Sequence, residues 1–397
     1  MARLPDGDPA PADGALSADA LATLCERALG VYVHVPFCTA RCGYCDFNVY
    51  VEPELRNGFL GGVRAELALA HRVLRPGHRP ADTVFLGGGT PTVLSAAEIA
   101  SILGAVRSSV GIADGAEITI EANPEDVDGP LLRALREAGV TSISLGMQSA
   151  VGHVLHALDR LHTPGRAHEA ALAARAAGFD VVGLDLIFGC HAETDADWET
   201  TLAEAVALAP DRVSAYELTV EPGTRLGAQV RSGALPAPDE DARARRYVAA
   251  DDALRAAGLQ WYEISSWARS EAAQSRHNQG YWTGQNWWGI GPGAHSHVGG
   301  TRWWNVLHPR AWGERLAAGV SPAAARETTD ATARRLERVM LELRLRTGVP
   351  LDLIDRPAAD RAAADGLLEL RNGHAILTLR GRLIADTLVR SLTAQPA

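Results

Sequence analysis

Residues 31–45 read VYVHVPFCTARCGYC. The β-branched and alternating run at its start predicts a strand, which the following Pro36 ends. Cys38, Cys42 and Cys45 then fall within eight residues on the adjoining loop. The chain has five cysteines in all, and an odd, tightly clustered set does not fit a disulfide framework. With no apolar signal-peptide segment in residues 1–14, we expect a cytoplasmic protein.

Strand-like runs followed by Ala/Leu/Arg-rich helical stretches repeat along most of the chain. Right-handed crossovers would place such units in a parallel α/β sheet that curls into a full or partial barrel of TIM type, and a doubly wound open sheet is the alternative. The predicted strands are 31–35, 83–86, 117–120, 142–145, 181–187, 212–218 and a closing strand at 261–264. The predicted helices are 54–73, 96–109, 129–138, 166–177, 196–208 and 239–257.

The composition divides the chain into four parts. Residues 1–29 are predicted to form a flexible leader with one short helix near 18–29, and the barrel occupies 30–270. An aromatic and Gly-rich segment spans 271–320, and eight of the nine tryptophans lie between Trp261 and Trp312. Residues 321–397 read as a small α+β domain of winged-helix type, with a long amphipathic helix (332–345) and a hairpin (367–379).

The overall composition excludes several classes of protein. The 397 residues are 47% hydrophobic and 22% charged, which does not fit a disordered, fibrous or membrane protein. The formal net charge is −10, and all 38 basic residues are arginines. The region from residue 321 onward has nearly balanced charges and no basic stripe, so we expect no nucleic-acid partner.

Polar and glycine motifs follow the predicted strands, at the edge where the carboxyl ends of parallel strands meet and where barrels carry their chemistry. Core packing does not require glycine triplets or carboxylates at this edge. The motifs are the cysteine loop, GGGTP at 87–91, EANP at 121–124, GMQS at 146–149 and Asp185.

The three clustered cysteines form a C-x3-C-x2-C loop. Closed structural zinc sites and most iron–sulfur clusters use four protein ligands. Three thiolates on a four-iron cluster leave one iron open, and the amino and carboxylate groups of a methionine moiety could bind there. The alternatives are three buried small hydrophobes or a zinc site completed by a distant histidine. Cys25 and Cys190 stand alone and read as ordinary cysteines.

The cysteine loop resembles the signature of radical S-adenosylmethionine enzymes, which hold a 4Fe-4S cluster in a partial (β/α)6 barrel. The chain from about Gly30 onward also resembles the oxygen-independent coproporphyrinogen III oxidase family. The motifs that carry this resemblance, besides the cysteine loop, are YVHVPFC at 32–38, GGGTP, E-x-N-P and the series Gln148, Arg160 and Asp185. The resemblance implies S-adenosylmethionine as a second cofactor, bound at the open iron.

The resemblance also implies roles for individual residues. Glu121, Arg160 and Asp185 could instead form a structural ion-pair set at the barrel mouth. The implied cluster ligands are Cys38, Cys42 and Cys45. The implied S-adenosylmethionine contacts are Tyr32, Tyr44, Gly88, Gly89, Thr90, Glu121, Gln148, Arg160 and Asp185, with the glycines admitting a close approach of the backbone.

Two branches of the family differ in chemistry. Oxidase members carry another cysteine two positions after the third, where this chain has Phe47. Members of the HemW-like heme chaperone branch carry H-N-x-x-Y-W, and this chain reads HNQGYW at 277–282. The chaperone branch implies heme bound at His277, a heme-acceptor protein, and transient contact with a membrane or respiratory-chain protein. Coproporphyrinogen oxidation and a radical reaction on another substrate are the alternatives.

One loop departs from the family pattern. After DLIFG at 185–189 the family continues with a hydrophobic residue, Pro and Gly, whereas this chain has Cys190, His191 and Ala192. The loss of Pro and Gly changes the backbone freedom of this loop.

Overall fold

A computed structural model of the chain describes residues 5–74, 77–160, 163 and 165–393. Its centre is a curved sheet in which six parallel strands lie side by side in sequence order. This order confirms the partial barrel and shows that the doubly wound alternative is wrong. The six strands are β1 (Leu29–Val35), β2 (Ala81–Gly88), β3 (Ile112–Ala122), β4 (Ser142–Gln148), β5 (Val181–Phe188) and β6 (Arg212–Glu217).

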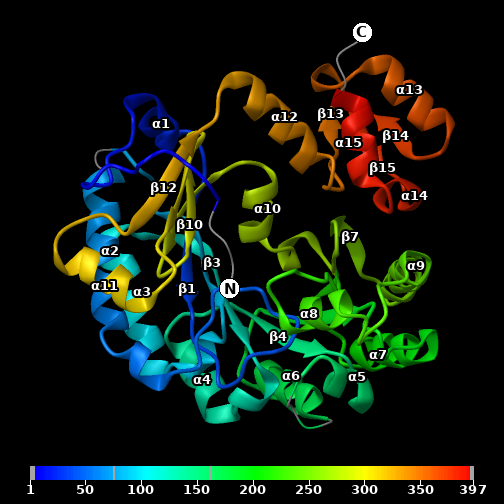
Figure 1. Ribbon diagram of the computed structural model, residues 1–397, viewed down its shortest axis with the longest axis horizontal. Helices are drawn as coiled ribbons and strands as arrows, with labels where there is room; N and C mark the ends of the chain where they lie inside the picture. The colour runs from blue at the N-terminus through cyan, green and yellow to red at the C-terminus, as the bar shows by residue number, and fades with distance from the viewer. Residues whose placement is uncertain (1–4, 75–76, 161–162, 164, 394–397) are drawn as a thin grey trace.

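Helices between these strands cover the outer face of the sheet (Figure 1). Two of them, α3 and α7, begin with complete capping boxes, at Ser95/Glu98 and Thr194/Asp197, which explains why their starts are readable from sequence. The helices confirm the six predicted ones to within a few residues, and two short helices are additional. They are α2 (Phe59–Leu74), α3 (Ala96–Ser109), α4 (Gly129–Glu137), α6 (Arg166–Ala176), α7 (Asp195–Ala207) and α9 (Glu240–Ala256), with α5 (Gly152–Ala157) and α8 (Arg225–Arg231) added.

The predicted closing strand does not continue the parallel barrel. It forms β7 (Gln260–Glu263), which pairs antiparallel with β8 (Ser266–Ala268), and β8 in turn pairs antiparallel with β6. Only two residues link β7 to β8, and such a link permits a hairpin but not a parallel crossover. The barrel therefore stays partial on this side.

The aromatic segment extends the opposite edge of the sheet instead of forming a separate unit. β9 (Asn286–Ile290) pairs parallel with β1, and three antiparallel strands follow it. These are β10 (His295–Val298), β11 (Thr301–Asn305) and β12 (Ala323–Thr328), and α11 (Pro309–Ala317) connects the last two. Four of the tryptophans in this segment are buried: Trp288, Trp303, Trp304 and Trp312.

A buried carboxylate ties this extension to α2. Glu66 accepts hydrogen bonds from the Gly291 amide (2.8 Å), the Asn305 amide group (2.6 Å) and the Trp312 indole (2.8 Å). Burial raises the pKa of Glu66 to about 7, although the three donors favour its charged form. The network fixes the glycine-rich turn between β9 and β10 against the barrel wall.

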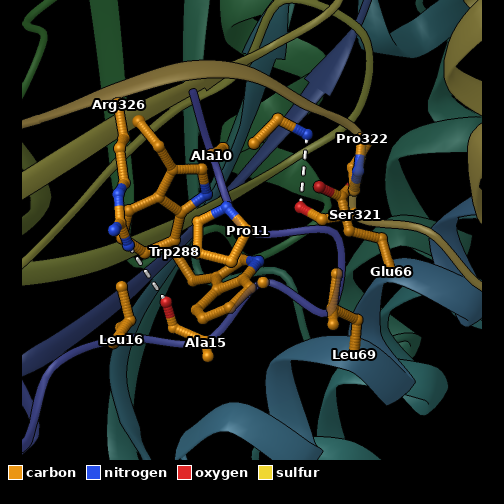
Figure 2. Close-up of a pocket in the computed structure, with 13 residues that line it drawn as sticks. Ala10, Pro11, Ala15, Leu16, Glu66, Leu69, Trp288, Ser321, Pro322 and Arg326 are labelled. Atoms are coloured by element: carbon orange, nitrogen blue, oxygen red, sulfur yellow. Dashed lines mark hydrogen bonds between the residues drawn. The ribbon is translucent and has the colours of Figure 1, made fainter. Parts of the chain in front are cut away.

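The segment predicted to be a flexible leader contacts β12. The Asp8 amide donates to the Arg326 carbonyl (2.8 Å), the Arg326 amide donates to the Asp8 carbonyl (2.9 Å), and Ser321 bonds to the Ala12 carbonyl (2.7 Å). Figure 2 shows Ala10, Pro11, Ala15 and Leu16 around the Trp288 indole, in a pocket that Leu69 also lines. The short helix of this segment is α1 (Ala18–Ala22), with a 3-10 turn at Thr23–Cys25.

The C-terminal region confirms the expected small α+β unit. α12 (Ala331–Glu342) leads into a three-stranded antiparallel sheet with the order β13-β15-β14. Its elements are β13 (Val349–Pro350), α13 (Arg356–Ala364), β14 (Leu368–Arg371), β15 (His374–Leu377), α14 (Leu379–Arg382) and α15 (Ala385–Thr393). One hydrophobic core runs from Leu29 through the barrel to Leu392. Among the described residues, no helix has the length and apolarity needed to cross a bilayer.

Candidate functional site at the carboxyl end of the barrel

The cysteine loop lies directly after β1 and leaves all three thiols partly exposed and free of disulfides. The Thr90 hydroxyl lies 3.5 Å from the Cys38 Sγ atom, and the Arg160 guanidinium lies 3.6 Å from the Cys42 Sγ atom. Both are sulfur contacts at the long end of hydrogen bonding, so the thiols have no strong competitor within the protein. This availability suits metal ligation.

Burial raises the pKa of the Cys45 thiol to about 11, and it also raises the pKa of Cys38. Charge repulsion from Cys42 further raises the pKa of both thiols, and repulsion from Cys38 also raises the pKa of Cys45. The positive charge of Arg160 lowers the pKa of Cys38. Burial therefore favours the protonated forms of Cys38 and Cys45, and a bound metal group would have to displace these protons.

The described residues include no group of three His, Cys, Asp or Glu side chains that could hold a metal ion. A zinc ion needs its ligands at one point, whereas a four-iron cluster binds each thiolate through a different iron atom. The three thiols are thus not gathered at one point as a bound zinc ion would require.

The GGGTP turn after β2 packs against β1. Gly89 donates to the Val35 carbonyl and Thr90 to the Phe37 carbonyl, both at 2.8 Å, while Gly88 donates to the Glu121 carboxylate at 3.0 Å. A Cβ atom on Gly88 would lie 2.3 Å from the His34 ring, and Gly88 has a φ of +108°. The chain's own packing thus requires glycine here, and the three amides already have partners.

Below this turn the barrel encloses a polar pocket of about 230 Å³. Glu121 and Asp185 face it, and Asp185 accepts a hydrogen bond from the Ser144 hydroxyl (2.9 Å). Burial, followed by repulsion from Asp185, raises the pKa of Glu121 to about 7. Burial also raises the pKa of Asp185. Glu121 and Asp185 are adjacent, partly buried carboxyls, and among the described residues no ion pair joins either of them to a cation. Such a site suits a ligand that carries positive charge or hydroxyl groups.

The alternative of a structural ion-pair set is not what the structure contains. In the described part of the chain, no ion pair joins Arg160 to Glu121 or Asp185. Arg160 instead contacts Cys42 and donates to the Gly146 carbonyl (3.2 Å). Gln148 has a φ of +62° at a bulge of β4, which places it beside Gly146 and Arg160.

Of the two predicted tyrosines, Tyr32 lies on β1 and Tyr44 lies within the cysteine loop. The Tyr32 hydroxyl bonds to the His34 ring at 3.0 Å and lines the polar pocket. Tyr44 lies within the loop and packs against a small apolar cluster that includes Cys190. The carboxyl end of the barrel thus brings together the predicted cluster ligands and S-adenosylmethionine contacts.

His277 also lines the polar pocket, on the side toward the amino end of the barrel. It is 4% exposed on α10 (Arg276–Trp282), and its ring stacks on Phe85 at 5.1 Å. Its Nδ1 atom lies 2.8 Å from the Thr83 hydroxyl, and its Nε2 atom lies 2.8 Å from the Tyr281 hydroxyl. Burial lowers the pKa of His277 to about 3. With both ring nitrogens bonded, His277 could bind iron only after one of these contacts breaks.

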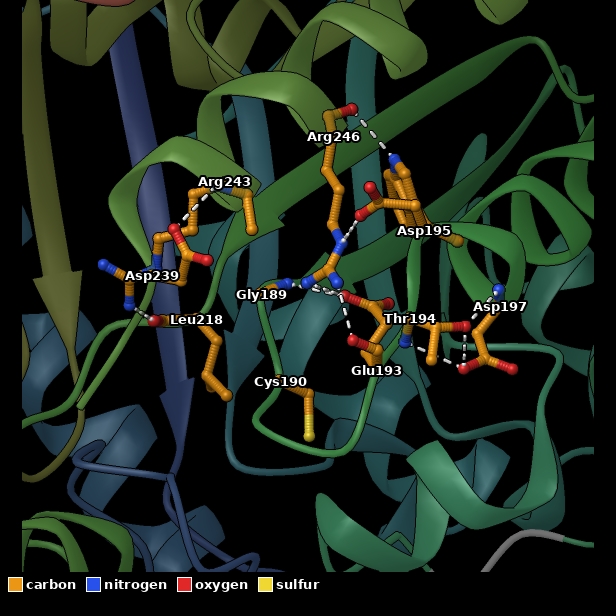
Figure 3. A network of polar contacts seen from close by, with 12 residues as sticks. Gly189, Cys190, Glu193, Thr194, Asp195, Asp197, Leu218, Asp239, Arg243 and Arg246 are labelled. Carbon is orange, nitrogen blue, oxygen red and sulfur yellow. Dashed lines mark hydrogen bonds and ion pairs between the residues drawn. The ribbon is translucent and has the colours of Figure 1, made fainter. Parts of the chain in front are cut away.

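The unusual loop after β5 is held by an arginine from α9 (Figure 3). Arg246 pairs with Glu193 (3.1 Å) and Asp195 (3.1 Å), and Glu193 also accepts a bond from the Gly189 amide (2.7 Å). Cys190 is buried, and its carbonyl accepts a hydrogen bond from the Glu193 amide (3.0 Å). This network fixes the loop in the absence of the family's Pro and Gly.

Several residues that line the polar pocket were missed by the sequence reasoning. Three of them lie on predicted strands, which was the available signal: Ser144 on β4, and Ser214 and Tyr216 on β6. Asn278 and Tyr281 reach the pocket from α10, and no sequence pattern could show that this helix enters the barrel.

Comparisons with known proteins show the family of this chain. The Radical SAM superfamily model matches residues 32–205, which contain the cysteine loop and the polar pocket's carboxylates. Heme chaperone HemW from Mycobacterium tuberculosis is 47% identical over 379 residues, covering 94% of this chain and 96% of that protein. The chain belongs to the HemW family. Heme chaperone HemW from Escherichia coli is 32% identical and covers 92% of this chain and 98% of that protein.

The solved structure of the family's oxidase relative has the same fold. Coproporphyrinogen III oxidase from Escherichia coli superposes with a TM-score of 0.81 over 94% of this chain and 91% of that chain. The sequence identity is 22%, so the likeness establishes the fold of the HemW family member and not its reaction.

Proposed function

We propose that this protein binds heme and transfers it to an acceptor protein, while its barrel holds a 4Fe-4S cluster and S-adenosylmethionine. The full-length similarity to proteins named heme chaperones supports this proposal. The observation that carries it within the structure is Phe47, which is 60% exposed at the mouth of a pocket beside the cysteine loop. An exposed aromatic ring offers a contact surface to a flat apolar ligand and offers no thiol chemistry.

Cys38, Cys42 and Cys45 would hold the cluster, and the polar pocket would receive S-adenosylmethionine. The amides of the GGGTP turn are occupied, so the methionyl ammonium group would donate to its carbonyl oxygens. Arg160 would pair with the carboxylate of the cofactor, and Asp185 would accept from ribose hydroxyls. When bound, the two groups supply one-electron redox chemistry.

An anaerobic heme titration tests the proposed function. After reconstitution with iron and sulfide, we expect about four irons per chain and a Soret band that saturates at about one heme per chain. Cluster absorption without any heme-induced Soret band would contradict the proposal. The acceptor and the contact with a membrane or respiratory-chain protein stay predictions, and capture of heme by a candidate acceptor would test them.

Coproporphyrinogen oxidation is the second candidate function, and the shared fold with the oxidase favours it. Incubation of the reconstituted, reduced protein with coproporphyrinogen III and S-adenosylmethionine separates the two. We expect no decarboxylated product, because the position of the oxidase branch's additional cysteine holds Phe47. Formation of protoporphyrinogen would replace the chaperone proposal with the enzyme.

A further inference from the structure

The histidines of the aromatic segment and the neighbouring barrel differ in whether their ring nitrogens are available. His34, His277 and His297 each have protein partners at both nitrogens. His295 is exposed, and within the described part of the chain its imidazole has no hydrogen-bond partner. An iron ion needs a nitrogen lone pair that is not already engaged, and His295 offers one.

The structure fixes His295 firmly despite this freedom. His295 opens β10 opposite Trp304, and its ring stacks on the Trp304 indole with centroids 5.9 Å apart and planes 29° apart. Its carbonyl accepts a hydrogen bond from the Trp287 indole (3.1 Å). A ring held by packing, with its nitrogens unbonded, is positioned in advance for a ligand.

His295 lines an open pocket of about 250 Å³ beside the cysteine loop. Phe47 and Leu307 supply apolar surface at this pocket, and Gly293 lines its wall. The pocket also shares Tyr32 and Glu121 with the polar pocket described above. A porphyrin is larger than this space, so its ring would lie across the mouth, against Phe47, where apolar contact removes both surfaces from water.

The position of His277 contrasts with that of His295. A Cβ atom on Gly30, near the start of β1, would lie 3.2 Å from the His277 ring. His34, which lines the His295 pocket, lies four residues farther along β1, or about 13 Å at the usual strand rise. His277 thus lines the polar pocket from the amino side of the barrel, whereas His295 lines the adjoining pocket on the side of the cysteine loop.

We propose that His295 binds the heme iron, with Phe47 and Leu307 against the porphyrin face. This inference rests on the proposed function, because it assigns the residue through which heme is held. It places the cargo next to the cluster and S-adenosylmethionine pocket and leaves His277 as a positioning residue that closes the amino end of the barrel.

Anaerobic titration of the cluster-reconstituted full-length chain with ferric heme tests the assignment. We expect His295→Ala to lose the wild-type Soret shift and to bind heme at least tenfold more weakly. Free imidazole added to His295→Ala should restore a histidine-type spectrum, which a merely structural defect would not allow. His308→Ala is the matched control, because His308 is exposed in the same segment, caps α11 and does not line the pocket.

Three outcomes would overturn the assignment. The first is an unchanged Soret band and affinity in His295→Ala. The second is loss of the Soret shift in a folded His277→Ala variant that retains its cluster. The third is tighter heme binding in Tyr281→Phe, which removes the hydroxyl that occupies the His277 Nε2 atom. Absence of heme binding by the wild-type chain would refute the proposed function itself, so the two failures are distinguishable.

Discussion

The two ends of the barrel both present residue types that bind metals, but they use them differently. At the carboxyl end, the thiols of Cys38 and Cys42 make long contacts of 3.5 Å with Thr90 and 3.6 Å with Arg160. At the amino end, His277 is buried and bonded at 2.8 Å through both nitrogens. A motif shows which residues could bind a metal, and the hydrogen-bond partners show which of them are available. The comparison predicts that changes at the carboxyl end alter ligand binding, whereas changes at the amino end alter stability.

The largest expected effect is on the cluster. Replacing Cys38, Cys42 or Cys45 with serine should lower the iron content from about four atoms per chain to below one, because each thiolate binds its own iron. Iron analysis and the visible spectrum after anaerobic reconstitution measure this. Cys25→Ser is the control, since Cys25 is exposed on the turn before β1. Retention of one zinc ion in place of iron would support the zinc alternative.

Removal of His277 should destabilise the fold. His277→Ala deletes a ring stacked on Phe85 and leaves the buried Thr83 hydroxyl without this partner. We expect a loss of about 2–4 kcal/mol in the free energy of unfolding, measured with urea at pH 7.5. Unchanged stability, together with lost heme binding, would show that the two ends of the barrel have been assigned wrongly.

The cost of this substitution should depend on pH. Burial lowers the pKa of His277 to about 3, so the folded chain keeps the ring neutral while the unfolded chain protonates it below about 6.5. The stabilisation is therefore complete above that value and falls as the pH falls. At pH 5 we expect the difference between wild type and His277→Ala to be smaller by about 2 kcal/mol. An equal difference at both pH values would mean that the ring is not buried and neutral.

A smaller effect is expected on cofactor affinity. The pKa of Glu121 is raised to about 7, so the carboxylate is mostly protonated at pH 6 and mostly charged at pH 8. The positively charged sulfonium group of S-adenosylmethionine should bind the charged form better, which allows up to about a tenfold gain between these pH values. Equilibrium binding to wild type and Glu121→Gln measures the gain. A pH dependence that persists unchanged in the variant would exclude Glu121 as its source.

The smallest effect is expected at Phe47. Because its ring is 60% exposed, Phe47→Ser should change the free energy of unfolding by about 0.5 kcal/mol or less. Heme affinity should nevertheless fall by about three- to tenfold, because the porphyrin loses an apolar contact. Val51→Ser, at another exposed apolar residue outside the pocket, is the control. Equal effects of both variants on heme binding would remove Phe47 from the site.

The sequence predicted the elements whose signals are local. The strands β1–β6 and the helices between them follow short apolar runs and capping residues, as at Ser95 and Thr194, so their positions could be read. Some limits differ, because β3 begins at Ile112 and α2 at Phe59, each five residues from its predicted start. The cysteine loop and the polar residues at the strand ends were readable for the same reason. The comparisons confirm the family that these motifs indicated.

The sequence could not show how the aromatic segment joins the barrel. β9 pairs with β1 across more than 250 residues, as in the register of Gly30 with Trp287, and adjacent tryptophans hide the alternation of a strand. The burial of His277 likewise depends on α10 entering the barrel beside Thr83. Such contacts are set by tertiary packing, which residue spacing does not record.

The central claim is that the three cysteines hold a cluster with one open iron beside the S-adenosylmethionine pocket. Electron paramagnetic resonance of the reduced, reconstituted protein, recorded before and after S-adenosylmethionine is added, tests it most directly. We predict a 4Fe-4S signal that changes on addition, because the cofactor binds the iron that lacks a protein ligand. A signal that S-adenosylmethionine leaves unchanged, or a protein that binds zinc and gives no signal, would contradict the account.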